Sequence, residues 1–104
     1  MILFHVTPKT NLPSILNTGL IPQVGERSEQ LKEEPGVFLF PSYEDCETAL
    51  SQWLGEQFEN PYEELVSLKV TLPNDFPLEE TCEWELVSRT IIEPKYIEFF
   101  KDEG

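Results

Sequence analysis

The sequence predicts a small α+β domain in which two main helices pack against split, largely antiparallel β-sheets. Apolar and polar residues alternate in several short segments, which is typical of half-buried strands. Two other segments carry apolar residues at helical spacing behind helix-capping residues. The chain has 104 residues, of which 39% are hydrophobic and 12% aromatic. We therefore expect one packed domain over residues 1–104.

The first predicted strand covers Ile2–Thr7 and contains the only histidine of the chain. Alternation places the side chains on two faces, one with Ile2, Phe4 and Val6 and the other with Leu3, His5 and Thr7. The histidine therefore points away from the apolar face and is available to a cleft.

A helix is predicted directly after this strand. It begins near an Asn11 cap and ends where Gly19 provides the C-terminal glycine. Its apolar stripe is formed by Leu12, Ile15 and Leu16.

The middle of the chain predicts a buried strand at 36–40, closed by Pro41, and then a second helix. Ser42 and Asp45 have the spacing of a capping box. The apolar residues behind them recur at helical spacing and are interpreted as core: Cys46, Ala49, Leu50, Trp53, Leu54 and Phe58.

Three further strands are predicted in the last third of the chain. Val66, Leu68, Val70 and Leu72 alternate with polar residues. A second strand that buries Trp84 and Leu86 would turn Glu83 and Glu85 outward, toward solvent or a cleft. A last apolar stretch covers Tyr96–Phe100.

Composition excludes several classes of function. No segment is apolar enough for a membrane span or a secretory signal. Cys46 and Cys82 lack metal-ligand spacing, and one histidine cannot complete a zinc site. Two buried free thiols fit a reducing compartment, so we expect a cytoplasmic protein without a metal.

The formal net charge is −13, from twenty acidic and seven basic residues. Such a charge repels phosphate backbones and argues against direct binding of nucleic acid. It could attract a basic protein, or serve only solubility. The acidic residues are scattered along the chain, which favours solubility as the simpler explanation.

A histidine and a carboxylate can form an acid–base pair, and His5 and Glu85 are the outward-facing candidates. Spacing alone does not separate this hypothesis from a histidine that is merely hydrogen-bonded within a strand.

Three parts of the chain together resemble the ADP-ribosyltransferase fold, in the branch of the DarT-type DNA ADP-ribosyltransferases and RNA 2′-phosphotransferases. The first is His5-Val6-Thr7 followed by N-L-P-S-I-L-N-T-G-L-I-P from Asn11 to Pro22. The second is the strand G-V-F-L-F-P-S at 36–42. The third is the ending from Glu85 through Ile92-Glu93-Pro94 to Ile97.

The resemblance implies that NAD is the substrate and lies in a cleft between two small sheets. It assigns to Glu85 the catalytic carboxylate, which stabilises an oxocarbenium-like transition state. His5 would hold the adenosine ribose, Thr7 would lie near the nicotinamide and Phe38 would flank it. Arg27 is the candidate for a pyrophosphate or acceptor contact.

Two functions follow as expectations. One is an NAD-dependent mono-ADP-ribosyltransferase that modifies a protein acceptor. The alternative is a non-catalytic acidic binding protein on the same fold, of the phage-inhibitor or antitoxin type, that blocks a basic and possibly nucleic-acid-binding partner.

Overall fold

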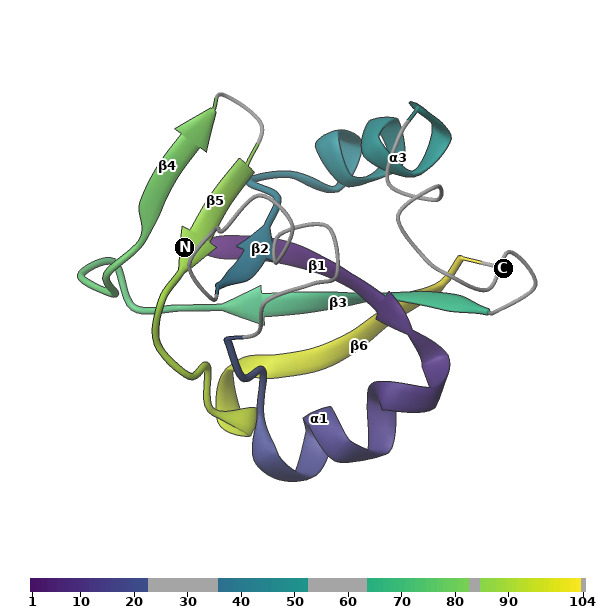
Figure 1. Cartoon of the computed structure of the whole chain (residues 1–104), viewed down its shortest axis with the longest axis horizontal. Coiled ribbons are helices and arrows are strands. Elements are labelled where there is room, and N and C mark those ends of the chain that lie inside the picture. The colour runs from purple at the N-terminus through teal and green to yellow at the C-terminus, as the bar shows by residue number, and fades with distance from the viewer. Residues whose placement is uncertain (23–35, 53–63, 83–84, 104) are drawn as a thin grey trace, which may run out of the picture.

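The computed structural model describes residues 1–22, 36–52, 64–82 and 85–103. These residues form two three-stranded antiparallel sheets and two α-helices (Figure 1), which confirms the predicted α+β class. The first sheet has the order β1-β3-β6, with β1 (Ile2–Pro8), β3 (Leu65–Thr71) and β6 (Ile97–Asp102). The second has the order β2-β5-β4, with β2 (Val37–Leu39), β5 (Glu85–Ser88) and β4 (Glu79–Cys82).

The helices α1 (Leu12–Thr18) and α3 (Tyr43–Gln52) lie on opposite sides of the first sheet (Figure 1). Two short 3-10 turns, η1 (Lys9–Asn11) and η3 (Pro94–Tyr96), lead into α1 and β6. None of the helices in the described part of the chain is long and apolar enough to cross a membrane.

Strand β1 contributes to both hydrophobic clusters that the described residues form. Leu3 belongs to the larger cluster, which includes Ile15 of α1, while Phe4 and Val6 belong to the smaller one beneath α3. The face expected to be the polar one is therefore largely buried, with Leu3 only 3% exposed and Thr7 only 5%. The reason is that β3 lies beside β1 and supplies apolar side chains on that face.

The two sheets are joined through β1 and β2. Phe4 and Phe40 exchange two backbone hydrogen bonds of 2.9 and 2.7 Å, which form an isolated antiparallel bridge. This bridge sets β2 beside β1, so residues of the two sheets come within reach of one another.

Helix α1 begins and ends close to the predicted positions. Asn11 is its N-cap residue, but the Asn11 side chain makes no capping hydrogen bond, and η1 precedes the helix instead. Gly19 ends the helix with a φ of 92°, and its N–H donates to the Ile15 carbonyl. The prediction for Leu16 was wrong: this side chain is 46% exposed, because the two-turn helix packs through Ile15.

Helix α3 begins at the predicted pair of Ser42 and Asp45. The backbone N–H of Asp45 donates to Ser42 Oγ at 3.1 Å, and the Ser42 hydroxyl donates to the Asp45 carboxylate at 2.9 Å. Cys46 and Ala49 are buried as expected. The core prediction for Trp53, Leu54 and Phe58 lies outside the described residues.

The later strands agree with the prediction in part. The four alternating apolar residues of 66–72 are all buried. In β5, however, Val87 is fully buried while Leu86 is only half-buried, and Trp84 lies outside the described residues. Val87 is enclosed because Gly36 has no side chain: a Cβ at Gly36 would lie 2.6 Å from Val87 Cγ1. In β6 the apolar stretch is mostly exposed, since only Ile97 is buried.

Candidate functional site

A pocket of about 250 Å³ lies between β1, α1 and β2. Strand β1 contributes His5 and Thr7, and β2 with the residue before it contributes Gly36, Val37 and Phe38. The remaining wall comes from α1 and its two ends: Asn11, Ser14, Ile15, Thr18, Gly19, Leu20 and Ile21. The pocket thus lies where the bridge between Phe4 and Phe40 brings the two sheets together.

His5 connects the two sheets at this pocket. Its Nδ1 lies 2.8 Å from the carbonyl oxygen of Phe38. A carbonyl can only accept, so Nδ1 carries the proton and donates it. Burial lowers the pKa of His5, although the hydrogen bond to Phe38 acts in the opposite direction.

The imidazole is consequently neutral at pH 7, and its Nε2 has a lone pair that can accept a hydrogen bond. Among the described residues no hydrogen bond to Nε2 is found. The half-buried His5 can therefore offer an acceptor to a hydroxyl or N–H group in the pocket.

Thr7 and Asn11 form a second polar pair in the pocket wall. The Asn11 side-chain amide donates to Thr7 Oγ1 at 3.3 Å. The side chain of Asn11 thus ties the start of α1 to β1 instead of capping the helix. Since a hydroxyl is both donor and acceptor, Thr7 can still donate to a ligand.

Phe38 and Glu85 lie on the same face of the second sheet. Phe38 pairs with Val87, and Glu85 is two residues before Val87 on β5. Glu85 is not among the described residues that line the pocket, and its carboxylate accepts a hydrogen bond of 3.0 Å from Thr81 Oγ1. Three of the predicted site residues, His5, Thr7 and Phe38, therefore meet at one pocket, while Glu85 stands on the neighbouring strand.

Arg27, the fifth predicted residue, lies outside the described residues. A different arginine, Arg89, packs against the pocket residue Gly36 and was not predicted from the sequence. A Cβ at Gly36 would be 2.9 Å from Arg89 Nη1, so the guanidinium packs against a pocket residue. Extending the alternation of Glu85 and Val87 by two residues would have placed Arg89 on the same face.

The described lining of the pocket contains no side chain that is charged at neutral pH, since His5 is neutral. Hydroxyl, amide and imidazole groups alternate there with apolar side chains. Such a lining suits an uncharged polar ligand group, such as a ribose or a base. Within the described part of the chain no three His, Cys, Asp or Glu side chains are grouped as a metal site would require.

No protein-family model, no curated protein and no solved structure matches the chain at a significant level.

Proposed function

We propose that this chain is an NAD-dependent mono-ADP-ribosyltransferase that modifies a protein acceptor. The observation that carries the proposal is the meeting of His5, Thr7 and Phe38 at one pocket, although they come from two different sheets. The periodicity of each strand does not require them to meet. A ligand cleft between two small sheets requires side chains from both sheets to lie around one cavity, as these three do.

Each side chain has a role that its chemistry supports. The neutral His5 accepts a hydrogen bond from a ribose hydroxyl through Nε2. Phe38 offers an aromatic surface against which the nicotinamide ring stacks. The Glu85 carboxylate stabilises positive charge on the ribose as the bond from C1′ to nicotinamide breaks.

In this reaction nicotinamide leaves with the electron pair of the broken bond. A nucleophilic side chain of the acceptor then bonds to C1′ and loses its proton.

The size of the pocket indicates how NAD would extend. Pockets that enclose drug-sized ligands hold about 300–1,000 Å³, whereas this one holds about 250 Å³. It is therefore large enough for one end of the dinucleotide only. The rest would cross β2 toward β5, where Glu85 lies on the same face as Phe38.

The net charge of −13 favours a protein acceptor. DNA and RNA carry one negative charge per phosphate, and an acidic surface repels them at long range.

The proposal is tested by incubating the protein with labelled NAD and host lysate proteins. We expect nicotinamide release, label transfer to a protein and a higher melting temperature with NAD. Glu85→Gln should abolish turnover while NAD binding persists, and His5→Ala should weaken both. Glu98→Gln is the matched control, because Glu98 is an exposed strand glutamate on β6. Neither NAD turnover nor stabilisation by NAD in the wild-type protein would refute the proposal.

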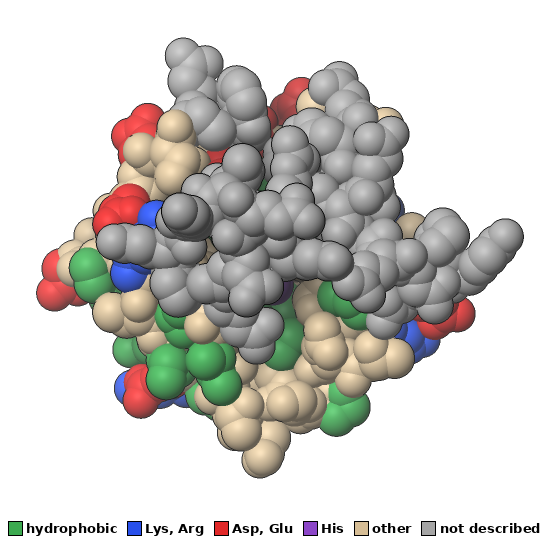
Figure 2. All heavy atoms as spheres, in the orientation of Figure 1, with side chains coloured by type: hydrophobic (Ala, Val, Ile, Leu, Met, Phe, Trp, Pro, Cys, Tyr) green, Lys and Arg blue, Asp and Glu red, His purple; other side chains and the backbone are tan. Residues whose placement is uncertain are grey.

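The second candidate function is a non-catalytic acidic protein that covers the basic surface of a nucleic-acid-binding partner. The net charge of −13 favours it, and the described pocket lining contains no lysine or arginine for the phosphates of NAD. On the face drawn in Figure 2, acidic side chains occur at several separate places around the edge. This function predicts no response to NAD and a binding to a basic protein that weakens steeply with salt.

A further inference from the structure

We propose that β6 is the interface of a symmetric homodimer, in which the β6 strands of two copies pair antiparallel and join their sheets. This inference goes beyond the proposed function and does not depend on it. Such a dimer requires a free strand edge, an apolar contact, and charges that match when the strand meets its own copy. The described residues of β6 provide all three.

Strand β6 has a free outer edge. It is the last strand of the first sheet, and β3 is the only described strand that pairs with it. No other backbone hydrogen bond among the described residues reaches residues 98–101. The edges of β1 and β2 face each other, since Phe4 and Phe40 form a backbone bridge, and β4 carries two adjacent carboxylates, Glu79 and Glu80. A free edge with exposed apolar side chains readily pairs with another strand, so β6 is the edge best suited to a second copy.

The apolar contact comes from Phe99. Two phenylalanines of β6 are exposed, Phe99 at 48% and Phe100 at 43%. The ring of Phe100 packs against Phe4 and Tyr43, with centroid separations of 5.1 and 4.9 Å. Phe99 makes no ring contact with any described residue. Its apolar surface would therefore gain most from burial against a second copy.

A bulge in β6 brings Glu98 and Lys101 to the same face of the sheet. Glu98 pairs with Lys69 and Lys101 pairs with Ser67, two positions of β3 that share a face. In a regular strand, side chains three positions apart point to opposite faces, but here Phe100 is an extra residue between the paired positions. The strand therefore presents one acidic and one basic side chain on one face.

These charges select the register of the dimer. Two identical antiparallel strands can be centred on one residue, which then faces itself across a two-fold axis. Centring on Phe99 brings the two Phe99 rings together. Glu98 of each copy then lies opposite Phe100 and next to Lys101 of the other copy, so the symmetry forms this ion pair twice. Centring on Phe100 would instead place Glu98 opposite Asp102, and the two carboxylates would repel each other.

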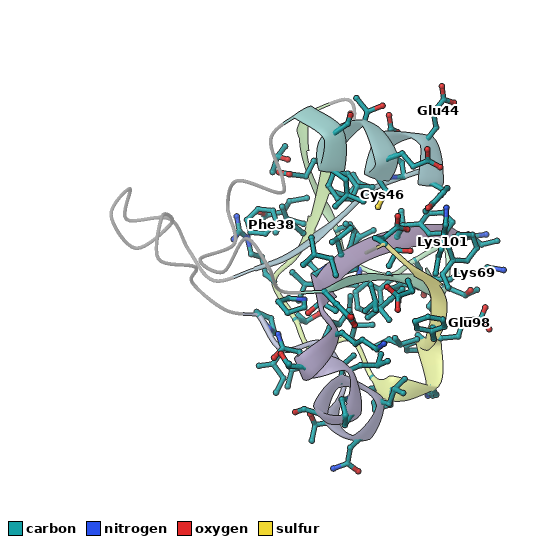
Figure 3. All side chains as sticks on the ribbon, turned by 90° about the vertical axis from the view of Figure 1, so that its right-hand side faces the viewer. Phe38, Glu44, Cys46, Lys69, Glu98 and Lys101 are labelled. Atoms are coloured by element: carbon teal, nitrogen blue, oxygen red, sulfur yellow. The ribbon has the colours of Figure 1, made fainter. Side chains whose placement is uncertain are left out.

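The proposed interface lies away from the pocket. Figure 3 shows Glu98 and Lys101 at one side of the molecule and Phe38 at the other. Pairing through β6 would therefore leave the pocket accessible.

The net charge of −13 opposes the association of two copies at long range. At about 0.15 M salt the Debye length is about 8 Å, so repulsion between distant charges is screened while neighbouring side chains still interact. The dimer is therefore to be measured at that salt concentration.

The test measures the monomer–dimer equilibrium by analytical ultracentrifugation over a range of protein concentrations. We expect the wild-type protein to reach twice the monomer mass as its concentration rises. Glu98→Lys and Lys101→Glu should each raise the dissociation constant about tenfold or more, because each replaces two attractive pairs by two repulsive ones. The double variant with both substitutions should restore the affinity, since it exchanges the charges and keeps the net charge.

Glu79→Lys is the matched control. Glu79 is also a strand glutamate that pairs with a cation, and its side chain is 56% exposed against 64% for Glu98. It lies on β4, in the second sheet. This substitution changes the net charge as Glu98→Lys does, but it should not weaken the dimer.

A disulfide gives a second measurement, which tests the register. Phe99→Cys would place each thiol opposite its own copy. Directly opposed Cβ atoms of an antiparallel pair lie about 4.5–5.5 Å apart, close to the separation in a disulfide. Mild oxidation should therefore link two copies of Phe99→Cys. Ile2→Cys, on β1 and 49% exposed, should not be linked, and it also controls for the native cysteines.

Three results would overturn the inference: a wild-type protein that stays monomeric at every concentration, a double variant no better than either single variant, or an equal weakening by Glu79→Lys. A monomeric wild-type protein would leave the edge of β6 to a strand from another protein. If circular dichroism shows that a charge variant does not fold, the disulfide decides, and the absence of linkage in Phe99→Cys would overturn the inference.

Discussion

Replacing Gly19 with alanine tests the turn that connects α1 to the rest of the protein. Gly19 has a φ of 92° and a ψ of −175°, a conformation that is essentially restricted to glycine. A Cβ at this position would overlap the carbonyl oxygen of Ile92 and lie 3.2 Å from Pro94 Cδ. The alanine side chain therefore cannot enter without moving the Ile92 backbone.

The expected loss can be estimated from two effects. A non-glycine residue in this conformation costs about 1–3 kcal/mol. Moving Ile92 also disturbs the two backbone hydrogen bonds, of 2.9 Å each, that it exchanges with Leu20. Each contributes about 0.5–1.5 kcal/mol. The sum, about 2–6 kcal/mol, is a large part of the roughly 5–15 kcal/mol by which domains are usually stable.

The assay is urea denaturation of the wild-type protein, Gly19→Ala and a control. Asn17→Ala is suitable as the control because Asn17 is exposed on α1 and alanine is a good helix former, so its stability should change by less than about 0.5 kcal/mol. A loss below about 1 kcal/mol in Gly19→Ala would show that the turn adapts to a side chain and that the geometry of Gly19 does not limit stability.

Three further predictions concern His5, Cys46 and Tyr43, whose side chains are buried or half-buried. The free energy of unfolding should fall as the pH drops below about 6.5, by at most about 1.4 kcal/mol per pH unit. The reason is that His5 binds a proton more readily in the unfolded chain than in the folded protein, where burial lowers its pKa. An equal dependence of the free energy of unfolding on pH in the wild-type protein and in His5→Gln would contradict this. Burial raises the pKa of the Cys46 thiol to about 12, so peptide mapping should find no alkylation of Cys46 at pH 8 before unfolding, and rapid labelling of native protein would be inconsistent with its burial. Tyr43→Phe removes the 2.6 Å hydrogen bond to Glu103 and should cost about 1–2 kcal/mol in urea denaturation, whereas wild-type stability would mean that Ser67, which also donates to Glu103, suffices.

The local features of the fold could be predicted from the sequence. Alternation identified β1 and β3, the pair Ser42 and Asp45 identified the start of α3, and Gly19 identified the end of α1. Each of these signals acts between residues that are close in the chain. The physical cause is therefore visible in the sequence itself.

The exposure of individual side chains depends on which element lies opposite, and the sequence does not state this. Leu16 has the helical spacing of a core residue, but no described apolar cluster includes it. The alternation that turns Glu85 outward also places Val87 on that face, yet the missing side chain of Gly36 allows Val87 to be enclosed.

The candidate site was predictable to a similar degree. A histidine on an early strand could be suspected of lining a cleft, but its hydrogen bond to the Phe38 carbonyl depends on the bridge between β1 and β2. The position of Arg89 behind Gly36 depends on the register of β2 and β5, which no local pattern gives.

The two-sided burial of β1 has a consequence for synthesis. Its sheet neighbour β3 begins at Leu65, and Ile2 pairs with Thr71. At roughly 5–20 residues per second, a ribosome needs several seconds to reach that point. During this interval the apolar side chains of Leu3, Phe4 and Val6 lack the strand that pairs with them. Contacts between distant parts of a chain also form slowly, so we expect β1 and β3 to pair late in folding, after the apolar side chains of β1 have been exposed to water.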